Sequence, residues 1–403
     1  MHNTYFYLSD HSGKTILAFG IEHEFVVEEI AQFSELQSYL NNHKGFHQFV
    51  FLSYELKNAT ENLSSNNKPL AHTPLAYFMR PRYVVELSEN GNKYLQGIPS
   101  NESESFIDSF KTNLAHQVNH RANHKLNPQI SKENYIEKVE RLKGLIQQGE
   151  IYEVTFCQLF EASVQIEEPL SLFGNLHKAS MAPFSCYIKF NDDHLLCMSP
   201  ERFIKKEGTK IYAQPIKGSS KRSSNKTEDE ILRTNLLNSE KERSENVMIV
   251  DLVRNDLSKI ARPNSVNVDE LFGIYSFPGV HQMISTISAE VKDEVNFTEI
   301  INALFPMGSM TGAPKMRAMQ IIDSFEEFQR GWFSGSVGYI SPNGDFDFNV
   351  VIRSLIYDAK NQKLSCPVGS AITINSDAES EYLECEFKIQ NIRNVLNSTS
   401  DEN

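Results

Sequence analysis

Two short segments of the chain carry pairs of glutamates at helical spacing. Glu242 and Glu245 precede a mostly apolar run over 247–253, and Glu381 and Glu384 form the second pair. Residues three apart share one face of a helix, so each pair would present two carboxylates to the same side. Mg²⁺ prefers oxygen ligands, and no histidine stands at the Glu-x-x-His spacing of di-iron sites. The four glutamates therefore predict a Mg²⁺ site, and two solvated acidic faces are the simpler alternative.

One of these glutamates has a rival role. Ser239 and Glu242 also have the spacing of a capping box, in which the two side chains close the start of a helix. Glu245 and Glu384 are for this reason the stronger candidates for metal ligands.

A lysine stands beside a glycine in the segment Gln-Pro-Ile-Lys-Gly-Ser at 214–219. The glycine at 218 would allow another molecule to approach closely. A lysine partly removed from water loses its proton more readily and can then act as a nucleophile. The segment makes Lys217 a candidate nucleophile, and a solvated surface lysine is the ordinary alternative.

The glycine-containing segment from Met307 to Lys315 is a candidate anion site. We expect Thr311 to cap a helix whose first turn contains Pro314. Free backbone N–H groups at such a helix start bind carboxylates or phosphates. An ordinary glycine-rich connection is the alternative.

A hairpin is predicted around the Asn-Gly turn at 341–344, with strands over 335–340 and 345–357. In one continuous strand, Asp347, Asn349, Val351 and Arg353 would share a face opposite apolar neighbours. Guanidinium is well suited to clamp a carboxylate, so Arg353 is a candidate substrate ligand. A structural ion pair is the alternative.

The composition describes an ordinary globular protein and excludes several function classes. Of the 403 residues, 40% are hydrophobic and 23% charged, and no apolar run approaches the length of a membrane span. The net charge of −13 argues against nucleic acid, which requires a basic face. The five cysteines show no zinc-type spacing. We expect a cytoplasmic protein without a membrane segment.

Helical and strand patterns alternate irregularly along the chain. Short strand-like runs separated by polar loops fill much of residues 1–127, where little chemistry is visible. Further on, Tyr135, Val139 and Leu142 recur at helical spacing before a strand-like run over 151–160. Helices interspersed with hairpins predict an α+β fold with antiparallel sheets. We place a domain boundary between residues 127 and 128, with the second domain reaching to residue 395.

Together these segments resemble the chorismate-utilising enzyme family, which includes the large subunits of anthranilate synthase and aminodeoxychorismate synthase, and isochorismate and salicylate synthases. The resemblance rests on five separated motifs, at 199–203, 215–219, 241–256, 308–315 and 376–384. It implies a layered fold with two large antiparallel-rich sheets packed together and helices outside. Residues 1–127 would form the family's N-terminal subdomain, and 128–395 the chorismate-binding catalytic domain.

The resemblance also implies which reaction is catalysed. Family members that aminate chorismate at the para position carry lysine in the Pro-Ile-Lys-Gly motif, where anthranilate synthases have alanine, and this chain has Lys217. Isochorismate and salicylate synthases use a lysine base at the position of Gln158, a role that glutamine cannot fill. The implied activity is Mg²⁺-dependent amination of chorismate to 4-amino-4-deoxychorismate, en route to para-aminobenzoate and folate. The alternatives are an anthranilate synthase large subunit and a non-catalytic paralogue that binds chorismate or docks a glutaminase.

In the mechanism that the resemblance implies, Glu201 protonates the departing C4 hydroxyl group while Lys217 attacks C2 of the ring. Ammonia then adds at C4 and expels the lysine. Mg²⁺ on Glu245 and Glu384, supported by Glu242 and Glu381, would bind the ring carboxylate. His281 matches the family's active-site histidine, and a buried structural histidine is the alternative. The remaining pocket residues implied are Gly218, Ser219, Tyr339, Arg353, Gly369, Ser370, Ala371, Thr311, Lys315 and Gln158.

The ammonia source is expected outside this chain. No glutaminase-like cysteine with a downstream His/Glu arrangement is found, so a separate glutamine amidotransferase subunit would supply it. Ser219 replaces the usual threonine and keeps its hydroxyl group, whereas Met307 and Ala371 replace common glycines and would narrow the pocket wall. The motif associated with tryptophan binding is not evident at 19–24, so we predict no feedback inhibition by tryptophan.

Overall fold

The structure is a computed structural model that describes residues 3–10, 12–88, 91–116 and 125–397. The helices are α1 (Leu36–Asn42), α2 (Lys57–Thr60), α3 (Asn101–Ala115), α4 (Lys132–Gln147), α5 (Pro169–Ser180), α6 (Lys226–Asn238), α7 (Glu240–Ser258), α8 (Phe297–Leu304), α9 (Lys315–Phe325), α10 (Ala378–Lys388) and α11 (Gln390–Asn397). Within the described part of the chain, no helix combines the length and the apolar character that crossing a membrane requires.

The longer strands are β1 (Thr4–Ser9), β2 (Thr15–Val27), β3 (Gln48–Leu52), β5 (Ala76–Leu87), β8 (Glu153–Ser163), β9 (Phe184–Phe190), β10 (Asp193–Ser199), β11 (Arg202–Glu207), β12 (Lys210–Gln214), β13 (Ile216–Lys221), β14 (Asn267–Ser276), β15 (Val280–Glu290), β18 (Ser336–Ile340), β19 (Phe346–Asn349), β20 (Ser354–Asp358) and β21 (Lys363–Ile372). The shorter ones are β4 (Lys68–Pro69), β6 (Lys93–Gln96), β7 (Asn127–Pro128), β16 (Gly312–Ala313) and β17 (Phe328–Gln329).

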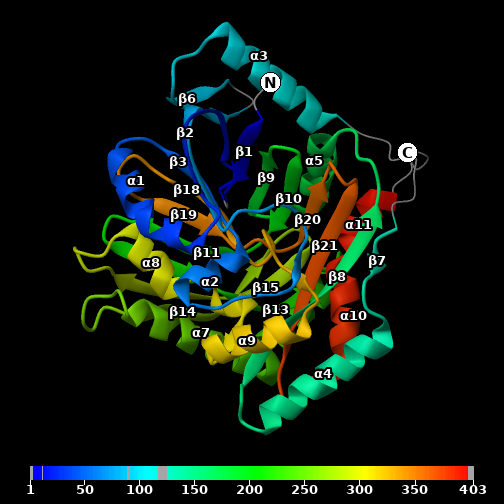
Figure 1. The fold of residues 1–403 in the computed structure, drawn as a ribbon. Helices are drawn as coiled ribbons and strands as arrows, with labels where there is room; N and C mark the ends of the chain where they lie inside the picture. Colours follow the sequence, from blue (N-terminus) through cyan, green and yellow to red (C-terminus); the bar gives the residue numbers. More distant parts are fainter. Residues whose placement is uncertain (1–2, 11, 89–90, 117–124, 398–403) are drawn as a thin grey trace.

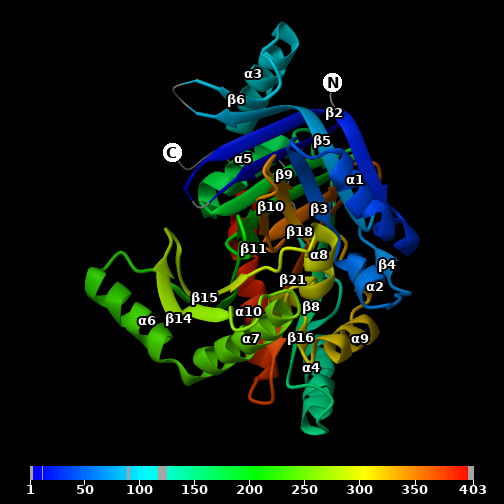
Figure 2. The same ribbon diagram turned by 90° about the vertical axis from the view of Figure 1, so that its left-hand side faces the viewer.

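Antiparallel pairing joins most of the strands into one network, in the order β8-β21-β20-β10-β9-β1-β2-β5-β3-β18-β19-β11-β12-β15-β14, with β13 also on β15. The α+β class with antiparallel sheets is confirmed. The two sheets expected from the sequence are joined by hydrogen bonds. Helices α4, α10 and α11 lie along β8 and β21, while α6 and α7 flank β13 to β15 (Figures 1 and 2).

Two hydrophobic cores follow from the strand period of two. In β1, Phe6 and Leu8 point into one core, which the strand network encloses, and Tyr5 and Tyr7 point into a second core under the outer helices. Both faces of this strand are buried, which explains its nearly continuous apolar sequence.

Strands from either side of the predicted domain boundary pair with one another. β1 pairs with β9, and β3 pairs with β18. Residues before 128 therefore complete the same strand network as the residues after it.

The strand predicted over 345–357 is broken into β19 and β20. Arg353 has φ +52°, in the left-handed region, and residues 350–353 lie outside both strands. The prediction of one continuous strand is wrong, because the chain leaves β19 after Asn349 and turns through the left-handed conformation of Arg353 before β20 begins.

Candidate active site

A cavity of about 280 Å³ lies among α7, α10, β13 and β21. It gathers most of the residues that the sequence singled out: Glu201, Lys217, Gly218, Ser219, Glu242, Glu245, Arg353, Gly369, Ser370, Ala371, Glu381 and Glu384. The two glutamate pairs come from α7 and α10, which begin at well-formed N-caps. Ser239 Oγ accepts from the Glu242 N–H at 3.4 Å, and the Asp377 side chain accepts from the Ser380 N–H at 2.9 Å.

Lys217 extends from β13 to a buried carboxylate of β8. Its Nζ lies 2.5 Å from Glu153 Oε1, and the two side chains are 9% and 0% exposed. Burial alone lowers the pKa of Lys217, but Glu153, Glu245 and Glu201 outweigh it and leave the pKa raised. The expectation that desolvation frees this lysine of its proton is wrong at rest, since nearby carboxylates favour the ammonium form. Glu153 is also the group best placed to take that proton.

The glycine after Lys217 brings β13 directly against α7. Gly218 has φ +92°, and a Cβ atom there would lie 2.8 Å from Glu242 Oε2. A side chain at 218 would crowd Glu242, and the left-handed backbone conformation there also disfavours residues other than glycine. The glycine therefore allows the lysine strand to pack closely against the carboxylate helix.

Glu201 is a buried carboxyl group on the cavity wall. It is 4% exposed, and its Oε1 accepts a hydrogen bond from Ser309 Oγ at 2.8 Å. Burial raises the pKa of Glu201 to about 7, although the Ser309 hydrogen bond and Lys217 oppose the shift. A carboxyl group that titrates near neutrality suits proton donation to a leaving group.

Lysines pair with three of the cavity glutamates. Lys241 Nζ lies 3.4 Å from Glu381 Oε1 and 4.0 Å from Glu245 Oε1, and Lys388 Nζ lies 2.6 Å from Glu384 Oε1. Burial raises the pKa of Glu245 to about 7. For Glu384, burial also acts upward, but Lys388 and the other lysines outweigh it and lower the pKa.

The glutamates fit Mg²⁺ in the chemistry of their donor atoms. All four offer carboxylate oxygens to one cavity, and Glu245 Oε1 is buried yet accepts no hydrogen bond. A buried acceptor without a partner favours a cation beside it. Among the described residues, however, no three His, Cys, Asp or Glu side chains are grouped closely enough to hold a metal ion. The ammonium of Lys241 bridges Glu245 and Glu381.

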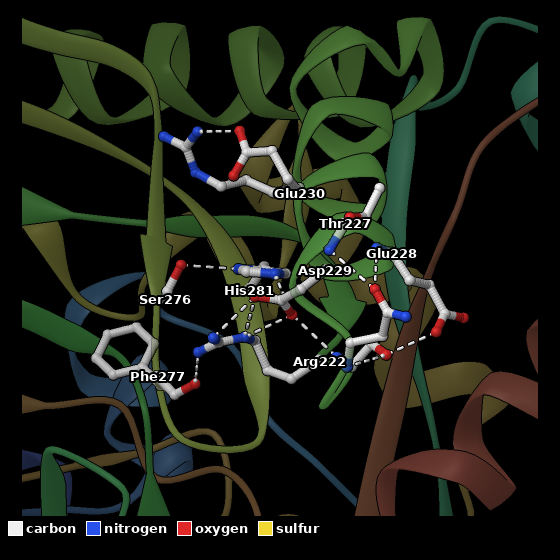
Figure 3. Close-up of polar contacts among 11 residues, drawn as sticks. Arg222, Thr227, Glu228, Asp229, Glu230, Ser276, Phe277 and His281 are labelled. Atoms are coloured by element: carbon white, nitrogen blue, oxygen red, sulfur yellow. Dashed lines mark hydrogen bonds and ion pairs between the residues drawn. The ribbon is translucent and has the colours of Figure 1, made fainter.

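The structure places His281 outside the cavity and its neighbour Gln282 among the lining residues. His281 Nδ1 lies 2.8 Å from Ser276 Oγ, and its Nε2 lies 3.1 Å from Asp229 Oδ1 (Figure 3). Asp229 is held in turn by Arg222, whose guanidinium is the largest cause of the lowered pKa of this carboxyl. His281 is fully buried in this network and does not line the cavity. A catalytic contact by His281 is therefore not supported by its position.

Four further predicted residues do not line the cavity. Tyr339 in β18 lies at a separate small cavity beside Asp347. Thr311 Oγ1 donates to the carbonyls of residues 307 and 308, so it does not cap α9, whose N-cap is Pro314. Lys315 pairs with Asp256 and donates to the Leu304 carbonyl at 3.2 Å. Gln158 is buried in β8.

Arg353 does line the cavity, at the bend between β19 and β20. Its Nη1 donates to the Lys388 carbonyl at 3.5 Å, and burial lowers the pKa of its guanidinium. A guanidinium held at a cavity wall is suited to a carboxylate ligand.

Sequence reasoning missed Glu153, Ser309 and Gln282. Glu153 carries a detectable signal, because it is an acidic residue near the start of a strand-like run that is mostly apolar. Ser309 and Gln282 carry no comparable signal, since neutral polar residues are common in such segments. Their relevance appears only from the cavity that they share.

A family model described as chorismate binding enzyme matches residues 2–394. The aminodeoxychorismate synthase component 1 of Salmonella typhimurium is 41% identical over 262 residues, covering 65% of this chain and 57% of that protein. The anthranilate synthase component 1 of Saccharolobus solfataricus is 29% identical, covering 86% of this chain and 79% of that protein.

Solved structures confirm the fold. The anthranilate synthase component I from Streptococcus pneumoniae has a TM-score of 0.79 at 24% identity, covering 94% of this chain and 92% of that one. The menaquinone-specific isochorismate synthase from Escherichia coli has a TM-score of 0.76 at 17% identity, covering 98% and 88%.

The matched region spans 57% to 59% of the length of three bacterial aminodeoxychorismate synthase component 1 relatives. The family model, by contrast, extends over nearly the whole chain. This match, together with the shared fold, shows that the chain belongs to the chorismate binding enzyme family.

Proposed function

We propose that this protein aminates chorismate at C4 and forms 4-amino-4-deoxychorismate. The observation that carries the proposal is that Lys217 and Glu201 line the same cavity as the two glutamate pairs. A primary amine and a carboxyl with a pKa near 7 are the nucleophile and the acid that this substitution needs. The relatives named aminodeoxychorismate synthase component 1 support the same assignment.

The first step proposed is the transfer of a proton from Lys217 Nζ to Glu153 Oε1, which lies 2.5 Å away. The neutral amine then forms a bond to ring carbon C2. The electrons of the two ring double bonds shift along the ring, and the C4–oxygen bond breaks. Glu201 gives its proton to the departing hydroxyl group, which leaves as water.

The second step proposed reverses this shift with ammonia as the nucleophile. Ammonia bonds to C4, the double bonds return to their original positions, and the C2–Nζ bond breaks. Glu153 returns its proton to the departing Lys217 amine, and the carboxylate of Glu201 can accept one from the newly bound ammonia. The lysine is thereby regenerated, and the new amino group stands where the hydroxyl group was.

We propose Mg²⁺ as the cofactor, held by Glu245 and Glu384 with support from Glu242 and Glu381. Bound there, the ion would supply positive charge for a substrate carboxylate. Arg353 would bind a second anionic group of the substrate. Gln282 Oε1 is buried and accepts no hydrogen bond, so it would accept a hydrogen bond from the substrate.

A separate glutamine amidotransferase subunit is proposed as the ammonia source. The relatives' designation as component 1 supports a two-component enzyme. All five cysteines of this chain are buried, and burial raises the thiol pKa of Cys157 and Cys366. A glutaminase nucleophile requires an accessible thiol with a lowered pKa.

The test is incubation of the purified protein with chorismate, Mg²⁺ and ammonium, with the product identified by mass spectrometry. We expect 4-amino-4-deoxychorismate, and at least about a 10⁴-fold loss of kcat/KM in Lys217→Ala, because the covalent route is removed. Lys221→Ala is the matched control, since this exposed lysine ends the same strand outside the cavity. Anthranilate as the product, or full activity in Lys217→Ala, would refute the proposal.

A further inference from the structure

Lys241 occupies an unusual position for a half-exposed lysine. Its side chain is 47% exposed, yet its Nζ reaches Glu381, whose side chain is 2% exposed, and lies within 4.0 Å of Glu245, whose side chain is 10% exposed. It therefore bridges the two helices that carry the glutamate pairs. Its own stem belongs to α7, one turn before Glu245.

The carboxylates that it bridges need a cation. Both are buried, and burying a carboxylate without a counter-charge is costly. Glu381 Oε1 has its ion pair with Lys241, whose ammonium is therefore its nearest counter-charge. Glu245 Oε1 accepts no hydrogen bond, and Lys241 adds to the larger compensation that Lys217 gives this carboxylate. A divalent ion at the same oxygens would compensate them better, but it would repel the ammonium at this distance.

We propose that Lys241 is the resident counter-ion of Glu245 and Glu381 in the metal-free protein and must leave them before Mg²⁺ binds. Lys241 thereby weakens the binding of free Mg²⁺ and keeps the carboxylate pair together until the ion arrives. Its exposed stem allows the displacement, because a half-exposed lysine can turn its ammonium into water without disturbing the core. This inference rests on the proposed function in taking Mg²⁺ as the ion.

The inference is tested by metal binding to the full chain, measured by calorimetry after removal of metal with a chelator. In Lys241→Gln, which keeps most of the side-chain length without the charge, we expect Mg²⁺ to bind about tenfold more tightly or better. Lys241→Arg keeps the charge and should bind as weakly as the wild type. Lys259→Gln is the matched control, because Lys259 follows the other end of α7 and pairs with Asp256 outside the cavity.

The second measurement is the unfolding temperature, with and without Mg²⁺. Without metal, Lys241→Gln should unfold at a lower temperature than the wild type, and Mg²⁺ should raise its unfolding temperature more than that of the wild type. Unchanged or weaker Mg²⁺ binding in Lys241→Gln, or tightening of the same size in Lys259→Gln, would overturn the inference. The product assay separates the two proposals: a wild type that forms no 4-amino-4-deoxychorismate refutes the function alone, whatever the binding data.

Discussion

Two buried ionic clusters contact β8, and they differ in how completely their polar atoms are used. In the first, Arg330 is 1% exposed and makes five hydrogen bonds, to both oxygens of Glu326, to Ser334 Oγ and to the carbonyls of Met310 and Thr155. These use all the N–H donors of a guanidinium.

In the second cluster, Lys217 pairs with Glu153, and several acceptors nearby have no partner. Glu153 Oε2, Glu245 Oε1 and Gln282 Oε1 are buried and accept no hydrogen bond. Buried polar groups are normally satisfied, so a cluster of exceptions beside a cavity indicates a place for a ligand. The Arg330 guanidinium therefore has no donor left for a ligand, whereas the Lys217 pair lies beside acceptors that the proposed ligands could use.

The largest expected effect on stability comes from breaking the complete cluster. Arg330→Met should lower the free energy of unfolding by about 3–5 kcal/mol, because Glu326 is left buried and unpaired. Lys217→Met should cost clearly less, since water in the cavity can solvate the groups that remain. Urea denaturation followed by circular dichroism measures both. An equal loss of unfolding free energy in the two variants would contradict the comparison. Arg233→Met removes one partner of an exposed ion pair and serves as the control, in which little change in the free energy of unfolding is expected.

The next largest effect should appear in catalysis alone. Glu201→Gln is expected to lower kcat/KM about 10²–10⁴-fold, because the proton donor is lost. Its free energy of unfolding near pH 7 should change by less than about 0.5 kcal/mol, since amide and protonated carboxyl are similar in shape. A variant that keeps wild-type turnover would assign the acid to another group.

The same role of Glu201 predicts a pH dependence of kcat/KM, which is a smaller effect. The folded-state pKa of Glu201, about 7, lies above its ordinary value of 4.5. The acid form is needed, so kcat/KM should fall about tenfold per pH unit above about pH 7, with free ammonia held constant. This raised pKa also means that the contribution of Glu201 to stability is present below about 4.5 and is lost as pH rises through 7. In Glu201→Gln, kcat/KM and the free energy of unfolding should both depend less on pH. If kcat/KM of that variant still fell above about pH 7 as in the wild type, the assignment would be wrong.

The smallest expected effect concerns the network outside the cavity. His281→Asn should change kcat/KM by no more than about threefold and cost about 1 kcal/mol of stability, because it removes hydrogen bonds to Ser276 and Asp229. Gln282→Leu, its neighbour on the other face of β15, should raise KM more strongly. Steady-state kinetics on both variants provides the measurement. A hundredfold loss in His281→Asn would place this histidine in the reaction after all.

Much of the fold could be predicted from local patterns. The helix with Tyr135, Val139 and Leu142 on one face is α4, and these three residues are its buried ones. The N-cap at Ser239 was also visible, because capping depends on side chains only a few residues apart. The break between β19 and β20 was not visible, since the segment between them is held by hydrogen bonds to distant parts of the chain, from the Val350 N–H to the Glu201 carbonyl and from the Met198 N–H to the Arg353 carbonyl.

The sequence by itself determined the family and most of the residues that line the cavity, because motifs, their spacing and residue types can be read directly from the sequence. Only the tertiary structure decided that Glu153 pairs with Lys217, that Lys241 bridges Glu245 and Glu381, and that Gln282 rather than His281 faces the cavity. The physical reason is the distance along the chain over which each effect acts. Propensity and periodicity act over a few residues, whereas these pairings join groups up to 140 positions apart, whose meeting depends on how the whole strand network closes around its core.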